Sequence, residues 1–214
     1  MGGVIEIERA GPLTTIQDAG RPGLLAHGIS ASGPMDGGAF RRAGLLAGSG
    51  SGAGVEFSLP GLELSVLEGE VTMGWDGGAF HVAVNGEEGR WPGGAVLKRG
   101  DRLRIWTGAG GNYGYLRFGG EIGVAPVLGS RATSLRARLG GLEGRVLKAG
   151  DRLAVIGEGL EPAEVSDRDL ADGPIRFIWG LHAEAFEPAV RAQFVTARFR
   201  VSAMMDRMGV RLRD

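Results

Sequence analysis

The 214-residue chain contains no cysteine. This absence excludes disulfide bonds, thiolate nucleophiles and metal sites built on cysteine. Lysine is almost missing as well, since Lys98 and Lys148 are the only two and neither lies between a glycine and a serine or threonine. The sequence therefore has no Walker-type phosphate loop. No lysine follows a methionine, so the chain also lacks the dipeptide at which biotin carriers are modified.

Other absences narrow the function further. The three histidines, His27, His81 and His182, are scattered and do not show the spacing of metal ligands, so we expect no metal site. A net charge of -1 provides no global field for nucleic acid. No apolar run approaches the length that spans a membrane, and the first residues, MGGVIEIERAG, lack the pattern of a secretory signal. We therefore expect a cytoplasmic protein without nucleic-acid or membrane partners.

Glycine is abundant, with 41 residues and no collagen-like period. Many short strands joined by tight turns explain this composition best, so a mainly β fold is predicted. Alternation or β-branched residues predict strands at 4–9, 14–17, 62–66, 71–75, 80–84, 103–106, 113–118, 175–180 and 199–203. The glycine-rich run 108–114 is interpreted as a loose hairpin turn rather than a nucleotide-binding loop, because a strand and not a helix follows it.

Two short helices are expected in this β-rich chain. Gly33 and Pro34 have the character of an N-cap and first helical residue, and apolar residues then recur at helical spacing as far as Leu46. Pro188 suits the start of the second helix. The acidic segment 157–173, with proline and glycine, is the best candidate for a boundary between two subdomains.

A weak internal repeat links VLKRGDRLRI at 96–105 with VLKAGDRLAV at 146–155. Both copies place Gly-Asp before an alternating strand, which predicts a repeated hairpin. Chance recurrence of Gly-Asp turns in a glycine-rich β protein is an equal alternative.

The first group of candidate site residues lies in the loop 11–36, among glycines and prolines. Asp18 and Arg21 are three residues apart around a glycine, and on its own such a pair is typical of a salt-bridged turn. Gln17, Ser32 and Asp36 add more polar groups than a turn needs, which favours a ligand-facing role for some of them.

A second group follows in GSRATS, residues 129–134. Ser130, Arg131 and Thr133 could form an anion pocket, because backbone N–H groups and a guanidinium suit a carboxylate or phosphate. The alternative is a polar strand end with Arg131 paired to a nearby acid, and the sequence leaves both open.

A third group lies near the end of the chain. An alternating strand would place Arg207, Gly209 and Arg211 on one face. A solvated charged face and a surface for an acidic substrate or partner both fit this pattern.

Four motifs together resemble one family. They are QDAGRPG followed by GISASGPMD (17–36), LRFGGEIGVAPVLGSRATS (116–134), GGLEGRVLKAGDRL (140–153) and FRVSAMMDRMGVRL (199–212). In this order they are similar to the biotin-dependent carboxyltransferase-like family, which includes the C-type subunit of 5-oxoprolinase, the second subunit of allophanate hydrolase, a kinase-inhibitor antagonist and part of urea carboxylase. The resemblance implies a cyclophilin-like β-barrel architecture in two subdomains, A and B, over residues 1–214. Relatives usually continue further, so the C-terminal part of the family domain is expected to be absent.

The resemblance also implies three functions. The first is a subunit of an ATP-dependent 5-oxoprolinase, which opens the lactam of 5-oxoproline to glutamate together with a kinase-inhibitor-like partner (the B-type 5-oxoprolinase subunit) and an A-type partner. ATP would bind here at a site of another kind or on a partner. The second is carboxyl transfer to a urea-like amide from carboxybiotin, supplied by a partner. The third is a non-enzymatic antagonist that binds the kinase-inhibitor-like partner.

Residue roles follow from the first of these functions. Asp18 or Asp36 would handle protons as catalytic residues. Gln17, Ser32, Ser130, Thr133 and Arg207 are predicted to bind the substrate or its anionic groups. Arg21 and Arg131 would hold its carboxylate or phosphoryl oxygens. These roles require the loops at 17–36 and 129–133 to meet in space.

Overall fold

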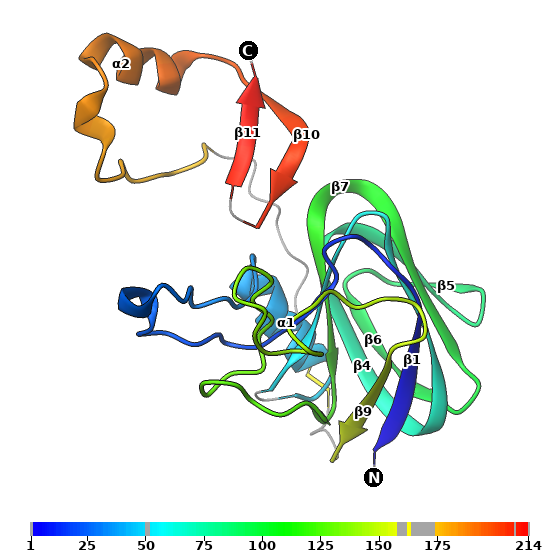
Figure 1. Ribbon diagram of the computed structural model, residues 1–214. Helices are drawn as coiled ribbons and strands as arrows, with labels where there is room; N and C mark the ends of the chain where they lie inside the picture. Colours follow the sequence, from blue (N-terminus) through cyan, green and yellow to red (C-terminus); the bar gives the residue numbers. More distant parts are fainter. Residues whose placement is uncertain (1, 50–51, 158–161, 164–173, 208, 214) are drawn as a thin grey trace. The chain divides into compact units, whose positions relative to one another are not determined.

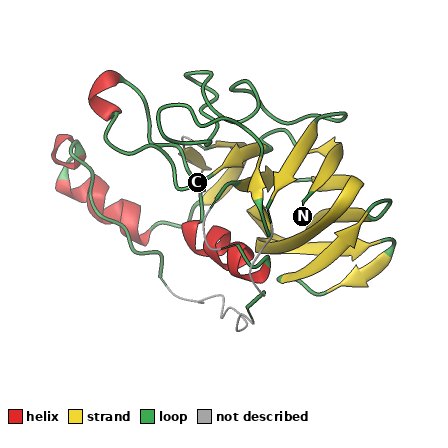
Figure 2. Cartoon of the chain, turned by 90° about the horizontal axis from the view of Figure 1, so that it is seen from below, coloured by secondary structure: helices red, strands yellow, loops and turns green. Residues whose placement is uncertain are grey.

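The computed structural model describes residues 2–49, 52–157, 162–163, 174–207 and 209–213. The chain divides into two units, Met1–Asp167 and Arg168–Asp214. Most of the predicted boundary at 157–173 falls outside the described residues. Strands are the main regular structure of the first unit, as the yellow arrows show (Figure 2). The predicted mainly β class is confirmed.

The first unit contains a nine-stranded sheet in the order β2-β3-β7-β4-β1-β9-β8, to which β5 and β6 add by pairing with β4. Its strands are β1 (Gly3–Ala10), β2 (Thr15–Gln17), β3 (Gly54–Ser58), β4 (Gly61–Val84), β5 (Glu87–Gly89), β6 (Gly93–Lys98), β7 (Arg102–Phe118), β8 (Glu121–Ile122) and β9 (Arg152–Ile156). The short helices are η1 (Leu25–His27) and α1 (Gly37–Leu46).

Two long strands curl this sheet into a half-barrel (Figure 1). Ile105 of β7 pairs with Leu62 on one part of β4 and with Val82 on another. One segment of β7 therefore lies between two segments of the same strand, which is possible only if β4 bends back on itself. The inner face holds a continuous apolar core that includes Ile5, Leu64 and Phe118, each fully buried.

The predicted division of β4 and β7 into short strands was wrong. The three strands expected at 62–66, 71–75 and 80–84 form the single 24-residue strand β4. The two expected at 103–106 and 113–118 belong to the single 17-residue strand β7. The run 108–114, expected to be a hairpin turn, continues β7. Gly111 has φ of +88°, and a Cβ there would lie 2.4 Å from Cα of Gly78. Glycines facing each other across β4 and β7 thus allow close backbone approach and curvature where the sequence suggested an end.

The internal repeat is a real structural repeat at its turns. Gly100 and Gly150 both have positive φ, and the Asp that follows each accepts a hydrogen bond from the N–H of Lys98 or Lys148. Each turn also exchanges two backbone hydrogen bonds with a neighbouring strand, at Val66 and at Ile7. Only the first copy forms the predicted hairpin, because residues 146–148 have no strand structure.

Helix α1 packs on the sheet through small residues. A Cβ at Gly74 of β4 would lie 2.3 Å from the carbonyl oxygen of Ala43, so only glycine allows this approach. Ala39, Phe40 and Ala43 pack with Tyr115 of β7 under the helix.

The second unit contains η2 (Ala183–Ala185), α2 (Pro188–Thr196) and a two-stranded sheet of β10 (Arg200–Asp206) and β11 (Gly209–Arg213). The predictions of a helix starting at Pro188 and a strand at 199–203 are confirmed, with Pro188 as the first helical residue. The strand expected at 175–180 is wrong, because 174–180 has no regular structure.

Candidate functional site

Asp18 joins the two loops that carry most of the predicted site residues. Its Oδ1 accepts hydrogen bonds from Ser130 Oγ at 2.6 Å and from the N–H of Gly20 at 2.8 Å. Its Oδ2 accepts one from the N–H of Arg131 at 2.6 Å. The loop 17–33 and the segment 121–133 therefore meet along one line of polar contacts, which we call the seam. The carboxylate accepts three hydrogen bonds, which we call the clamp because they hold the loop and the segment together.

Arg21 is the second bridge across the seam. It is only 2% exposed, and its guanidinium donates to the carbonyl oxygens of Val127, Ser130 and Ala132 and to Ser32 Oγ. No carboxylate pairs with it among the described residues. Its charge is satisfied by carbonyl dipoles. The Asp18–Arg21 salt bridge that the spacing suggested is absent from the described structure, and both side chains reach the segment after Ile122 instead.

Gln17 connects the two parts of the seam through buried hydrogen bonds. Its side chain is fully buried, and it donates to the Thr133 carbonyl at 3.2 Å and accepts from the N–H of Gly33 at 3.0 Å. Thr133 returns a backbone hydrogen bond to the Ile16 carbonyl at 2.8 Å. Its hydroxyl is buried without a hydrogen-bond partner within the described ranges. The two strand ends are thus fixed relative to each other, and one buried hydroxyl remains unused.

Arg131 is the seam guanidinium that solvent can reach. Its side chain is 29% exposed, Nε donates to the Val124 carbonyl at 2.8 Å, and Nη1 lies 3.6 Å from Oε2 of Glu121. Glu121 also accepts from the N–H of Ala53 at 2.9 Å. The nearby acid left open as an alternative partner of Arg131 is therefore present. Sequence reasoning missed Glu121, although its place directly after two glycines was a usable signal.

Asp36 caps helix α1. Its Oδ1 accepts from the N–H of Ala39 at 2.9 Å, and its own N–H donates to the hydroxyl of Tyr115 at 2.6 Å. The expected N-cap at Gly33 is wrong by three residues, because the aspartate side chain satisfies the first helical N–H groups and glycine cannot. Asp36 therefore has a structural role, and its catalytic role stays a prediction.

A buried cation lies behind the seam, on β7. Arg117 is 4% exposed, donates to Ser49 Oγ at 3.0 Å, and stacks over the ring of Phe40 at 4.2 Å. Burial lowers its pKa to about 10, an effect that the nearby charges of Glu121 and Asp18 oppose. Burial likewise raises the pKa of the Tyr115 hydroxyl above its usual range. Sequence reasoning gave neither residue a role.

Arg207 is not on the strand face that was predicted for it. It lies in the turn between β10 and β11, because the chain reverses there, while Gly209 and Arg211 belong to β11. Arg207 is part of the second unit, whereas all the other predicted site residues belong to the first.

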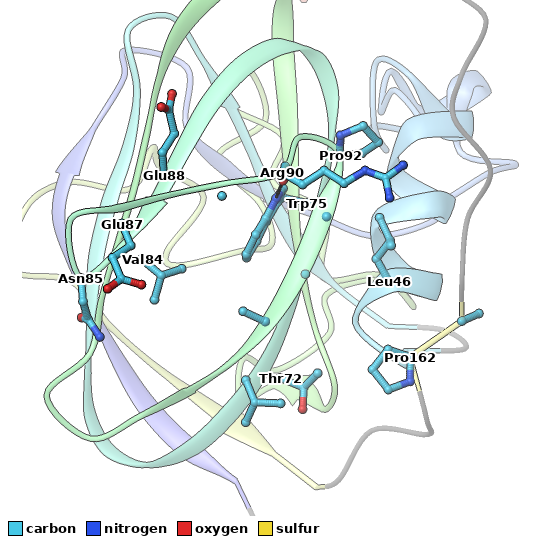
Figure 3. Close-up of a pocket in the computed structure, with 16 residues that line it drawn as sticks. Leu46, Thr72, Trp75, Val84, Asn85, Glu87, Glu88, Arg90, Pro92 and Pro162 are labelled. Atoms are coloured by element: carbon cyan, nitrogen blue, oxygen red, sulfur yellow. Dashed lines mark hydrogen bonds between the residues drawn. The ribbon is translucent and has the colours of Figure 1, made fainter.

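A large hollow in the described structure lies away from the seam. It has a volume of about 940 Å³ and is lined by Leu46, Thr72, Trp75 and residues of β5 and β6 (Figure 3). The floor is apolar at Trp75, whose indole N–H donates to the Arg90 carbonyl at 3.0 Å. None of the predicted site residues lines this hollow, so the candidate site does not coincide with it.

The seam as described favours anion binding over proton transfer. Asp18 and Asp36 are occupied by donors, and the Ser130 hydroxyl and the N–H of Arg131 are used by Asp18, so the partly exposed Arg131 guanidinium is the seam group that an anion in solvent could reach. Such a guanidinium suits a carboxylate or phosphate oxygen. Within the described residues, no three histidine or acidic side chains gather as metal ligands, and no helix is long and apolar enough to cross a membrane.

One family model covers most of this chain. The model of the carboxyltransferase domain, subdomains A and B, matches residues 27–214. The chain belongs to this family. The predicted resemblance is thereby confirmed, and the seam lies within the matched region except for Gln17, Asp18 and Arg21.

Individual relatives of this carboxyltransferase-domain chain fall into two groups. It is 36% identical to the C subunit of 5-oxoprolinase from Escherichia coli over 98% of its own length and 68% of that protein. It is 32% identical to urea amidolyase of Saccharomyces cerevisiae, covering 97% of this chain and 12% of that protein. The crystal structure of the K. lactis urea amidolyase matches all of this chain and 14% of that one, with a TM-score of 0.82 and 26% identity.

Proposed function

We propose that this chain is a subunit of an ATP-dependent 5-oxoprolinase and acts only together with partner subunits. The observation that carries the proposal is the similarity to the C subunit of 5-oxoprolinase over almost the whole chain, covering 68% of that relative. Urea amidolyases match with similar identity, but the chain corresponds to only about an eighth of their length. The relative that is matched over the larger share of its length is the better parallel.

Arg131 is proposed as the residue that holds the anionic group of the substrate. Its guanidinium is partly exposed, and the loop that carries it is fixed because its backbone N–H and the Ser130 hydroxyl both donate to Asp18. Arg21, Gln17 and Asp18 are proposed to position this group, because their own polar atoms are already engaged inside the seam. Ser32 and Thr133 border the same contact, and the Thr133 hydroxyl is buried without a partner within the described ranges.

The proposed chemistry needs an activated lactam. Transfer of the γ-phosphoryl group of ATP to the carbonyl oxygen would make its carbon electrophilic, water would add, and the C–N bond would break. A second water would then release phosphate from the acyl phosphate, leaving glutamate and ADP. Arg131 would stabilise negative charge on the substrate during these steps. ATP is proposed to bind on a partner, because the glycine-rich run 108–114 is part of β7 and the sequence has no Walker-type loop.

A second candidate function is carboxyl transfer from carboxybiotin to a urea-like amide, which the urea amidolyase similarity favours. It would use the same anion site but needs a biotinylated partner. A third is a non-enzymatic antagonist that binds a kinase-inhibitor-like partner.

One reconstitution separates the three. Glutamate release from 5-oxoproline and ATP is measured with the chain alone, with the A-type and B-type partners from the same organism, and with all three together. Turnover only in the full mixture is the expected result. A stable complex without turnover would support the antagonist. Carboxylation of urea with a biotinylated partner and no glutamate release would support carboxyl transfer.

A further inference from the structure

Backbone strain among the described residues is concentrated in the seam and in the segment 134–145 that follows it. Five non-glycine residues among those described have positive φ, and four of them, Ser32, Leu128, Arg138 and Glu143, lie in the loop 17–36 or in the segment 121–145. The fifth, Asn85, precedes Gly86 in an ordinary Asn-Gly hairpin turn. Strained residues persist only where the surroundings hold them, and they cluster at functional surfaces.

Leu128 is the least expected of the four. With φ of +52° it is followed by Gly129 at +79°, and Val127 and Ser130 exchange two backbone hydrogen bonds across the turn. This two-residue turn strongly prefers asparagine, aspartate or glycine at the Leu128 position. The Leu128 side chain is 55% exposed, so burial does little to offset the strain.

Arg21 holds the two residues that flank the turn. Its guanidinium donates to the carbonyls of both Val127 and Ser130, the two residues that flank the turn, and Ser130 is held again by Asp18. The seam thus displays a leucine outward at a cost in stability. A residue that costs stability and gains little burial in the isolated chain is expected to make its contact elsewhere.

We propose that Leu128 is an anchor for a partner protein of the proposed complex, which covers it with an apolar pocket bordered by acidic side chains. This inference rests on the proposed function. A protein is the expected partner because the loop 17–36 and the segment 121–145 also expose other apolar side chains: Leu25 is 79% exposed, Met35 46% and Leu135 37%. We expect acidic side chains around the partner's pocket because Arg136 and Arg138 are exposed and have no ion-pair partner within the described ranges.

The test uses two substitutions that separate strain from contact. Leu128→Gly removes both the side chain and the strain, whereas Leu128→Ala removes the contact but keeps the strain. We expect Leu128→Gly to raise Tm by about 2–4 °C and Leu128→Ala to leave it nearly unchanged. Both should weaken binding to the mixture of A-type and B-type partners by about tenfold or more, measured by titration calorimetry.

Val96→Ala is the matched control, since Val96 is 48% exposed on β6, away from the seam. It should bind as the wild type does. Wild-type affinity for both Leu128 variants would overturn the anchor while leaving the proposed function intact, and a lower Tm for Leu128→Gly would show that the leucine is structural. If the wild-type chain binds neither partner and gives no glutamate, the proposed function fails and the anchor with it.

Discussion

The N–H of Arg131 lies 2.6 Å from the Asp18 carboxylate, so two residues 113 positions apart in the chain are joined by a direct hydrogen bond. The bond uses the backbone of Arg131, whereas its partly exposed guanidinium contacts the Val124 carbonyl and Glu121. This separation of roles lets the seam be tested piece by piece, because the clamp and the proposed ligand group belong to different atoms.

Removing the clamp should destabilise the fold. Asp18→Ala leaves the Ser130 hydroxyl and the N–H groups of Gly20 and Arg131 without their acceptor, and we expect a loss of about 2–3 kcal/mol in the free energy of unfolding. Urea denaturation followed by circular dichroism measures it. Glu68→Ala, on an exposed part of β4, is the control. Unchanged stability for Asp18→Ala would show that the three hydrogen bonds do not hold the loops together.

Arg21 should prove structural and not exchangeable for lysine. A lysine ammonium presents three donors on a single point, whereas the guanidinium reaches three carbonyls and a hydroxyl arranged around it. We expect Arg21→Lys to lower the free energy of unfolding by about 2 kcal/mol or more. Arg9→Lys, at a half-exposed position on β1, should change it little. Equal stabilities for the two variants would argue against a positioning role for Arg21.

Acid stability should depend on the turn at Asp151. Hydrogen bonds from Arg145, at 2.7 and 2.9 Å, lower the pKa of this carboxyl below its ordinary value of 3.8. Because the folded pKa is below the unfolded one, the stabilisation is present above about pH 4 and is lost as the pH falls through the folded value. Denaturation midpoints measured between about pH 7 and pH 2.5 should therefore fall less steeply for Asp151→Asn than for the wild type. Parallel curves for both proteins would contradict this linkage.

Glycine at the α1 contact should be irreplaceable. A Cβ at Gly74 would lie 2.3 Å from the Ala43 carbonyl, so Gly74→Ala must push the helix off the sheet, and we expect a loss of about 3 kcal/mol or failure to fold. Gly37, at the start of α1, has open space and ordinary φ, so Gly37→Ala should stabilise the chain by about 0.5–1 kcal/mol. Thermal unfolding of the two variants compares them directly. Similar Tm values would mean that the helix is not packed as described.

The sequence predicted most of the local structure but not its curvature. Alternation located β1, and Pro188 located the start of α2, because these signals are local. The long strands β4 and β7 were divided at their glycines, since one sequence cannot distinguish a glycine that ends a strand from one that lets it bend against another glycine. That distinction depends on the facing strand, which lies far away in the chain.

The sequence predicted which residues of the two loops lie together, but not how each side chain is oriented. The loops at 17–36 and 129–133 were expected to meet, and Gln17, Asp18, Arg21, Ser130, Arg131 and Thr133 do lie together. The difference between Arg21, which is buried against carbonyls, and Arg131, whose guanidinium stays partly exposed, could not be predicted from residue types because both are arginines beside glycines or serines. Glu121 was missed because its partner comes ten residues later.

The assignment of Arg131 is tested most directly by Arg131→Ala in the reconstituted 5-oxoprolinase reaction. The substitution keeps the backbone N–H that binds Asp18 and removes the partly exposed guanidinium with its contacts to Val124 and Glu121. We predict that glutamate release falls by about 100-fold or more, while Tm stays within about 2 °C of the wild type. Arg152→Ala, which removes an exposed arginine paired with Glu6, should retain full turnover. Turnover by Arg131→Ala equal to the wild type, or its failure to fold, would contradict the assignment of Arg131 as the anion-binding residue.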